Sequence, residues 1–181
     1  MIAEESFALF VDNSGSVGGC TNYWDTVNNI LIEYARDITH FYYWNSNCGL
    51  TTKKEFEIWA ASKRGTGGTS PETVAQEIVN QEFSNIILVT DGEVGDYNVS
   101  ACDKILEEAS QKKQFKIKKS ICYVIGSYSE PNLSVTCPFT RYSESKVFSR
   151  KGAEAVKSVM QYTAADYEIL TDLENITLEN F

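Results

Sequence analysis

Two short, uninterrupted apolar runs are the strongest pattern along the chain. Residues 7–11 read Phe-Ala-Leu-Phe-Val and residues 86–89 read Ile-Ile-Leu-Val, and a polar stretch containing Asp and Gly follows each run. Continuous apolar runs of this length are typical of strands that are buried on both faces. We therefore predict two neighbouring central strands whose carboxyl ends open into acidic turns.

Apolar residues spaced three and four apart predict helices between these strands. The clearest stripe runs over residues 23–38. A second helix is predicted over residues 71–81, because Ser70 is a suitable N-cap and Pro71 suits the first helical position. Further helices are predicted over residues 100–113 and 153–160.

The remaining strands are shorter and are predicted from aromatic content and alternation. Residues 40–44 are rich in aromatic side chains, and residues 55–60 alternate, so we predict an antiparallel strand pair joined by a turn over 45–52. Residues 120–125 predict another strand, and 147–149 a short edge strand. Strands that alternate with helices indicate the α/β class, with a doubly wound, mostly parallel central sheet.

Length, composition and charge narrow the functional classes. The 181 residues correspond to one domain, and 43% hydrophobic and 23% charged residues are typical of a globular protein. There are 25 Asp and Glu against 16 Lys and Arg, giving a net charge of -9. Because this charge repels a phosphate backbone, we expect no nucleic-acid partner.

The ends of the chain and its cysteines give further expectations. Residues 164–181 carry five acidic residues and no Lys or Arg, so we divide the chain into a domain over 1–163 and an acidic C-terminal tail that packs on the domain or on a partner. The first apolar run is too short for a signal peptide or a membrane span. Five cysteines without CxxC spacing favour reduced thiols. We therefore expect a cytoplasmic protein with no membrane partner.

The side chains best suited to bind a ligand follow the predicted strands. Asp12, Ser14 and Ser16 follow the first strand, Asp91 follows the second buried strand, and Thr69 lies in a glycine-rich loop that opens a helix. Ligands of open α/β sheets bind beyond the carboxyl ends of the strands. All five side chains are hard oxygen donors, which favours magnesium or manganese over zinc or copper.

In this order, the Asp12-x-Ser14-x-Ser16 motif, Thr69 after a double glycine, and Asp91 before a glycine resemble the metal-ion-dependent adhesion site (MIDAS) of von Willebrand factor A domains and integrin inserted domains. The resemblance covers essentially the whole chain, since the order of predicted elements is also similar. It implies a Rossmann-like sheet in the order 3-2-1-4-5-6, with a short antiparallel third strand.

The resemblance also implies how the residues bind the metal. Ser14 and Ser16 bind it directly, Thr69 binds it directly or through water, and Asp12 and Asp91 act largely through bridging waters. The expected ion is Mg²⁺, with Mn²⁺ or Ca²⁺ as alternatives.

Three neutral hydroxyl ligands quench little of a divalent charge, so an open coordination position attracts a carboxylate. We therefore predict a non-enzymatic, divalent-cation-dependent protein-protein interaction module that binds a Glu or Asp of a partner protein. One alternative is a self-assembling structural protein, a homo-oligomer in which the acidic tail of one copy occupies another copy's metal site. A less favoured alternative is a metal-assisted hydrolase that uses Asp12 or Asp91. The chain has no GxxxxGK[ST] phosphate loop, and its single histidine, His40, is predicted at the opposite end of the sheet.

Overall fold

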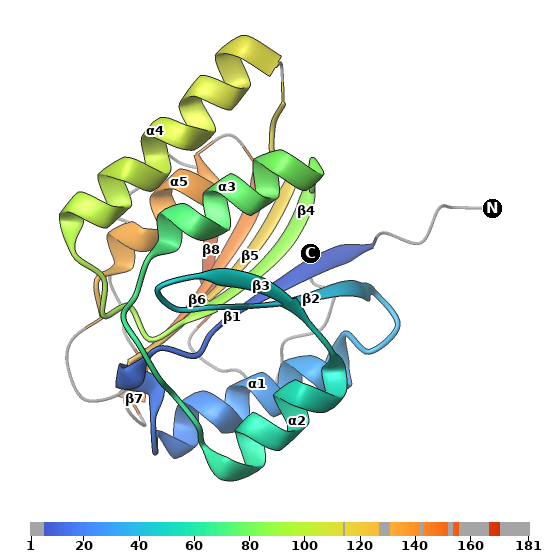
Figure 1. Cartoon of the computed structure of the whole chain (residues 1–181), viewed down its shortest axis with the longest axis vertical. Helices are drawn as coiled ribbons and strands as arrows, with labels where there is room; N and C mark the ends of the chain where they lie inside the picture. Colours follow the sequence, from blue (N-terminus) through green and yellow to red (C-terminus); the bar gives the residue numbers. More distant parts are fainter. Residues whose placement is uncertain are drawn as a thin grey trace.

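The computed structural model describes residues 6–113, 115–126, 131–141, 143–151, 154–155 and 167–170. A central sheet carries helices on both faces (Figure 1). The strands of the described residues are β1 (Phe7–Asp12), β2 (Ile38–Trp44), β3 (Cys48–Thr51), β4 (Asn85–Thr90), β5 (Lys119–Gly126), β6 (Glu144–Lys151), β7 (Glu154–Ala155) and β8 (Tyr167–Leu170). The helices are α1 (Thr21–Glu33), α2 (Lys53–Ser62), α3 (Pro71–Gln81), α4 (Asp96–Lys113) and α5 (Cys137–Thr140), with short 3₁₀ turns η1 (Gly15–Val17) and η2 (Leu133–Thr136).

The sheet confirms the predicted fold class. Its strands run in the order β3-β2-β1-β4-β5-β6, and both β7 and β8 pair with β6. Pairs among the first six strands are parallel, except that β3 is antiparallel to β2. The protein is therefore a Rossmann-like α/β fold with strand order 3-2-1-4-5-6 and an antiparallel edge strand.

The central strand β1 is buried on both faces, which explains its uninterrupted apolar run. Successive side chains of a strand point to opposite faces. Leu9 and Val11 pack in the cluster formed with α1 and α2, whereas Ala8 and Phe10 pack in the cluster formed with α3, α4 and α5. The two groups of helices cover opposite faces of the sheet (Figure 1).

The prediction of a helix over residues 71–81 is confirmed by α3, whereas the predicted helix over 23–38 is too long. Helix α1 ends at Glu33, and Ile38 already begins β2. The apolar stripe continues past the helix because Tyr34 and Ile38 are buried in the same cluster as the helical residues. Periodicity therefore predicted burial correctly and the end of the helix incorrectly.

The prediction of a strand over residues 55–60 is wrong, because these residues belong to α2. The antiparallel partner of β2 is β3, inside the region predicted to be a turn. Thr52 caps the helix, since its hydroxyl accepts a hydrogen bond from the Glu55 amide at 3.2 Å. Phe56 and Ala60 are both buried, while Ile58 is 50% exposed. The buried positions are therefore four residues apart, as on one face of a helix, and not two apart, as on one face of a strand.

The later elements match the predictions in part. The strand over 120–125 is confirmed within β5, and the strand over 147–149 lies within β6. The latter is not an edge strand, because β6 also pairs with β7 and β8. The helix predicted from residue 100 begins at Asp96, and the Ser100 hydroxyl donates to the Asp96 carbonyl inside it.

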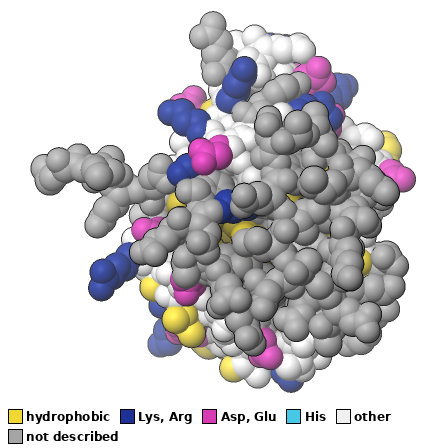
Figure 2. Space-filling view, turned by 180° about the vertical axis from the view of Figure 1, so that it is seen from behind, with side chains coloured by type: hydrophobic (Ala, Val, Ile, Leu, Met, Phe, Trp, Pro, Cys, Tyr) yellow, Lys and Arg dark blue, Asp and Glu magenta, His cyan; other side chains and the backbone are white. Residues whose placement is uncertain are grey.

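The C-terminal predictions fall mostly outside the described residues. Of the helix predicted over 153–160, only residues 154–155 are described, and they form strand β7, so that part of the prediction is wrong. Within the acidic tail over 164–181, residues 167–170 are described and pair with β6 as β8. Among the described helices, none combines the length and apolar content that crossing a bilayer requires. Figure 2 shows that basic and acidic side chains are interspersed among the described residues of the visible face.

Candidate metal centre

The carboxyl ends of β1 and β4 bring the acidic turns together at one edge of the sheet, as predicted. The Thr90 hydroxyl donates a hydrogen bond to Asp12 Oδ2 at 2.9 Å. The Ser14 amide donates to Asp12 Oδ1, also at 2.9 Å. Both carboxyl oxygens of Asp12 are therefore held in place, and Asp91 follows Thr90 directly in the chain.

The glycine-rich loop that carries Thr69 lies against the loop that carries the two serines. The Thr66 amide donates to the Asn13 carbonyl at 2.7 Å, and the Gly15 amide donates to the Gly67 carbonyl at 2.9 Å. Thr69 is half-buried, and within the described residues its hydroxyl makes no hydrogen bond. The loops thus meet, and the Thr69 hydroxyl remains available to a ligand.

The close approach of these loops requires a glycine at position 65. A Cβ atom at Gly65 would overlap the carbonyl oxygen of Ser14 and lie 2.7 Å from the amide nitrogen of Gly18. Real Cβ atoms do not approach backbone atoms so closely, so a larger residue here would separate the two loops.

The predicted ligands differ in burial: the two carboxyl groups are more deeply buried than the hydroxyl groups. Asp12 and Asp91 are fully buried, Ser14 is 1% exposed, and Ser16 and Thr69 are half-buried. The hydroxyl oxygens of Ser14 and Ser16 lie 3.1 Å apart. Adjacent ligands of an octahedral Mg²⁺, each about 2.1 Å from the ion, are separated by about 3 Å. The serine pair therefore fits one edge of such a coordination shell.

Two buried carboxyl groups side by side make this edge of the sheet electrostatically unfavourable in the absence of a cation. Burial raises the pKa of Asp12 from 3.8 to about 7, and the neighbouring Asp91 carboxyl raises this pKa as well, against the opposing effect of the Ser14 and Thr90 hydrogen bonds. A divalent cation would offset this repulsion. No cluster of three or more His, Cys, Asp or Glu side chains that could hold a metal forms among the described residues. The predicted ligands are instead two carboxyl and three hydroxyl groups, a combination that suits a hard ion.

Some residues around the centre were not predicted from the sequence. The Tyr23 hydroxyl, from α1, donates to the Asp12 carbonyl at 2.5 Å and lies 3.3 Å from the Val89 carbonyl. Its place in the apolar stripe over residues 23–38 predicts a core residue, and nothing in its helical spacing distinguishes it from one. The sequence contains only a weak indication that Thr90 belongs to the centre: it carries a hydroxyl group at the end of an otherwise apolar strand.

Pro131 and Asn132 also border the centre. The Asn132 amide donates to the Gly92 carbonyl at 2.9 Å. Gly92 has a φ of +75°, a conformation that L side chains rarely adopt, and a Cβ there would lie 2.7 Å from Pro131. The glycine of the Asp91-Gly92 pair is therefore required by both backbone conformation and contact.

His40 lies where the sequence predicted it, near the amino end of β2. It pairs with Ala8 at the start of β1, is exposed, and packs against Phe83 with ring centroids 5.0 Å apart. The histidine is thus at the opposite end of the strands from Asp12 and Asp91.

Glu93 is exposed next to the centre, and its amide donates to Asp91 Oδ1 at 3.0 Å.

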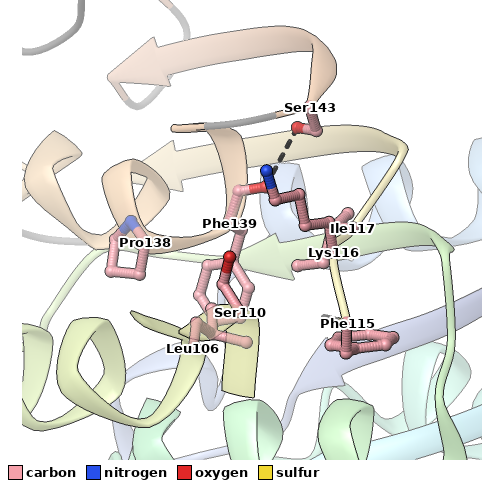
Figure 3. A pocket seen from close by; sticks show the side chains of 8 residues that line it. All are labelled: Leu106, Ser110, Phe115, Lys116, Ile117, Pro138, Phe139 and Ser143. Carbon is pink, nitrogen blue, oxygen red and sulfur yellow. Dashed lines mark hydrogen bonds between the residues drawn. The ribbon is translucent and has the colours of Figure 1, made fainter. Parts of the chain in front are cut away.

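Two hollows outside this edge contain none of the predicted metal ligands. One lies between α4, α5 and residues 115–117 just before β5, where Leu106 and Phe139 line its wall (Figure 3). Its volume of about 20 Å³ accommodates roughly one water molecule. The other is an open groove of about 550 Å³ along α4 and the start of α3, beside Tyr97, which is 84% exposed.

No family model matches the chain, and a search of curated proteins finds no match. The residues and geometry at the carboxyl edge of the sheet are therefore the basis for a functional assignment.

Proposed function

We propose that this protein is a divalent-cation-dependent protein-interaction module of the von Willebrand factor A type. The cation is Mg²⁺, with Mn²⁺ or Ca²⁺ as alternatives, and its proposed binding residues are Asp12, Ser14, Ser16, Thr69 and Asp91. The observation that carries the proposal is the pair of buried carboxyl groups at one edge of the sheet, next to half-buried hydroxyl groups.

The chemistry of these groups supports a protein partner with an acidic side chain. Asp12 and Asp91 supply negative charge from the buried side, whereas the hydroxyls of Ser16 and Thr69 are neutral and partly accessible to solvent. A bound cation would supply a positive centre that accepts a carboxylate oxygen from a Glu or Asp. The proposal assigns no catalytic residue.

The cysteines support a cytoplasmic location as part of this proposal. All five lie in the described part of the chain, and no disulfide bond joins any of them. Cys102 and Cys122 are fully buried, and burial raises the pKa of both thiols. Buried thiols of this kind are compatible with a reducing compartment.

Magnesium binding to the whole chain tests the metal centre. Isothermal titration should detect Mg²⁺ binding to the native protein and a large loss of affinity in Asp12→Ala. Asp25→Ala, which removes an exposed carboxyl on α1, is the matched control and should bind as the native protein does. Unchanged binding by Asp12→Ala would refute the assignment.

The open coordination position is tested with Mn²⁺, whose bound water relaxes solvent protons. The Mn²⁺-loaded protein should enhance water relaxation, and N-acetylglutamate amide should reduce this enhancement by displacing water. An enhancement that the carboxylate does not change would argue against acidic-residue recognition. Oligomers that EDTA dissociates would instead support the self-assembling alternative.

A further inference from the structure

The turn between β2 and β3 holds the chain on both sides of Thr69. The Gly68 amide, just before Thr69, donates to the Ser46 hydroxyl at 2.9 Å. The Ser70 amide, just after it, donates to the Asn45 carbonyl at the same distance. Neither turn residue is among the predicted metal ligands, yet together they hold the residue before and the residue after Thr69.

The turn is itself ordered by hydrogen bonds. The Asn45 amide donates to the Asn47 carbonyl at 2.8 Å, and the Asn47 amide donates back to Asn45 Oδ1 at 3.0 Å. Such a side-chain to backbone bond over two residues is an Asx turn, which preorganises the backbone. Ser46 therefore projects from a turn that has ordering hydrogen bonds of its own.

The same loop is anchored on its other side to the serine motif. The Gly67 carbonyl accepts from the Gly15 amide at 2.9 Å, and Gly15 lies between Ser14 and Ser16. The segment 67–70 is thus bonded to the serine loop at its start and to the β2–β3 turn at its end. The position of the Thr69 hydroxyl relative to the two serine hydroxyls depends on both anchors.

We infer that Ser46 is a positioning residue of the metal centre, which acts by fixing Thr69 rather than by touching the ion. This inference rests on the proposed function, because it assumes that Thr69 binds the cation. Ser46 is exposed, so its hydrogen bond competes with water and its effect should be moderate.

Magnesium titration of position 46 variants tests the inference. Ser46→Ala removes the acceptor for the Gly68 amide and should weaken Mg²⁺ binding about fivefold, in line with the loss of one hydrogen bond. Ser46→Thr keeps a hydroxyl and should restore most of the affinity. Ser100→Ala removes an exposed hydroxyl bonded only within α4 and should leave the affinity unchanged.

A double-mutant cycle distinguishes positioning from a general structural role. In a Thr69→Ala background, Ser46→Ala should have no further effect on Mg²⁺ affinity, because the group it positions is absent. In EDTA, the Gly68 amide should exchange with deuterium faster in Ser46→Ala than in the native protein.

The possible failures of the two proposals are separable. If the native protein does not bind Mg²⁺, the proposed function fails. If the native protein binds Mg²⁺ and Ser46→Ala binds it equally well, the inference about Ser46 is overturned while the metal centre stands. The same holds if Ser46→Ala lowers the Mg²⁺ affinity by the same factor in the Thr69→Ala background as in the native protein.

Discussion

The Thr90 hydroxyl donates a hydrogen bond to Asp12 Oδ2 at 2.9 Å and thereby joins the ends of two neighbouring parallel strands. The same hydroxyl oxygen accepts a bond from the Gly92 amide at 3.1 Å. One side chain therefore orients the carboxyl group at the end of β1 and shapes the turn that follows β4. Both acidic residues of the candidate metal centre depend on it.

Replacement of this hydroxyl should destabilise the protein even without metal. Thr90→Val keeps the volume but leaves Asp12 Oδ2 and the Gly92 amide without their buried partner, at an expected cost of about 2 kcal/mol. Urea unfolding in EDTA measures this cost. Thr90→Ser retains the hydroxyl and should recover much of the stability, whereas a Thr90→Val variant as stable as the native protein would contradict the prediction.

The stability of the metal-free protein should depend on the protonation of Asp12. Its pKa is about 7 in the folded chain against an ordinary 3.8, so folding favours the protonated form. The contribution of Asp12 to the free energy of unfolding should therefore be greatest below about pH 4. It should fall by up to about 4 kcal/mol as the pH rises to about 7.

Asp12→Asn isolates this contribution. The variant should show a flatter dependence of unfolding free energy on pH between 4 and 7 in EDTA, because the buried group no longer ionises. Addition of Mg²⁺ at pH 7.5 should stabilise the native protein but not Asp12→Asn. A native protein whose stability in EDTA is independent of pH over this range would count against the argument.

A methyl group at Gly65 should disturb the centre through contact alone. The added Cβ of Gly65→Ala would collide with the backbone at Ser14 and Gly18, so the two loops must separate, at an expected cost of about 2 kcal/mol. Mg²⁺ affinity should fall as well. Gly95→Ala is the matched control, because its Cβ would meet only Asn98 Oδ1 at an ordinary 3.5 Å. Equal behaviour of the two variants would show that the loops accommodate the methyl group.

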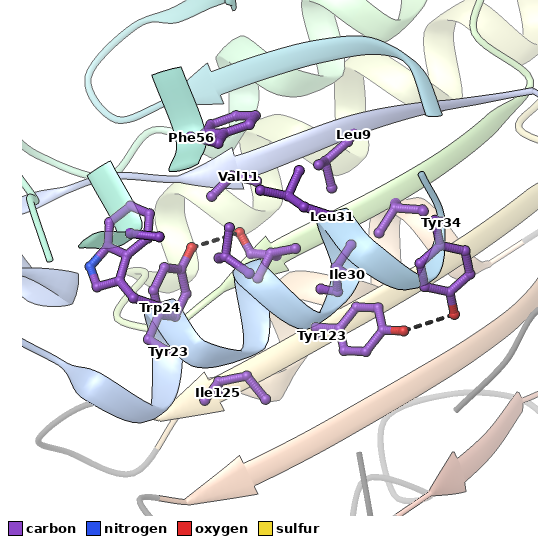
Figure 4. Close-up of a cluster of buried hydrophobic side chains, with 14 of the residues drawn as sticks. Leu9, Val11, Tyr23, Trp24, Ile30, Leu31, Tyr34, Phe56, Tyr123 and Ile125 are labelled. Atoms are coloured by element: carbon purple, nitrogen blue, oxygen red, sulfur yellow. Dashed lines mark hydrogen bonds between the residues drawn. The ribbon is translucent and has the colours of Figure 1, made fainter. Parts of the chain in front are cut away.

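The buried tyrosine pair should show energetic coupling away from the metal centre. The hydroxyls of Tyr34 and Tyr123 point toward one another at 2.9 Å, in a cluster that α1 shares with β5 (Figure 4). Tyr34→Phe or Tyr123→Phe should each cost about 1 kcal/mol by leaving one hydroxyl unpaired. The double variant should cost about as much as either single one, and additive losses in urea unfolding would refute the coupling.

The sequence was sufficient to predict the fold class and the place where the candidate ligands meet. Continuous apolar runs identify buried strands. Because the two strands are parallel neighbours, the residues after Val11 and Val89 lie at the same edge of the sheet. Helix α3 was predicted at its observed bounds because Ser70 and Pro71 mark its start. These features are local or follow from the handedness of α/β connections.

The errors arose where local patterns had two interpretations. Residues 55–60 alternate as a strand would, but Phe56 and Ala60 also match one face of a helix, and the cap at Thr52 decides for the helix. The hydrogen bonds of Thr90 and Ser46 join residues far apart in the chain, so no window of sequence contains both partners. Such tertiary contacts could be seen only in the folded structure.

The bond between Asp12 and Thr90 closes a separation of 78 residues. Contacts between distant segments form late and slowly, because the chain must first lose the entropy of a long loop. A nascent or partly unfolded copy would therefore lack the bond that orients Asp12. In the proposed function, the cation site would form only once the chain has folded, and a partner that recognises the cation would bind folded chains alone.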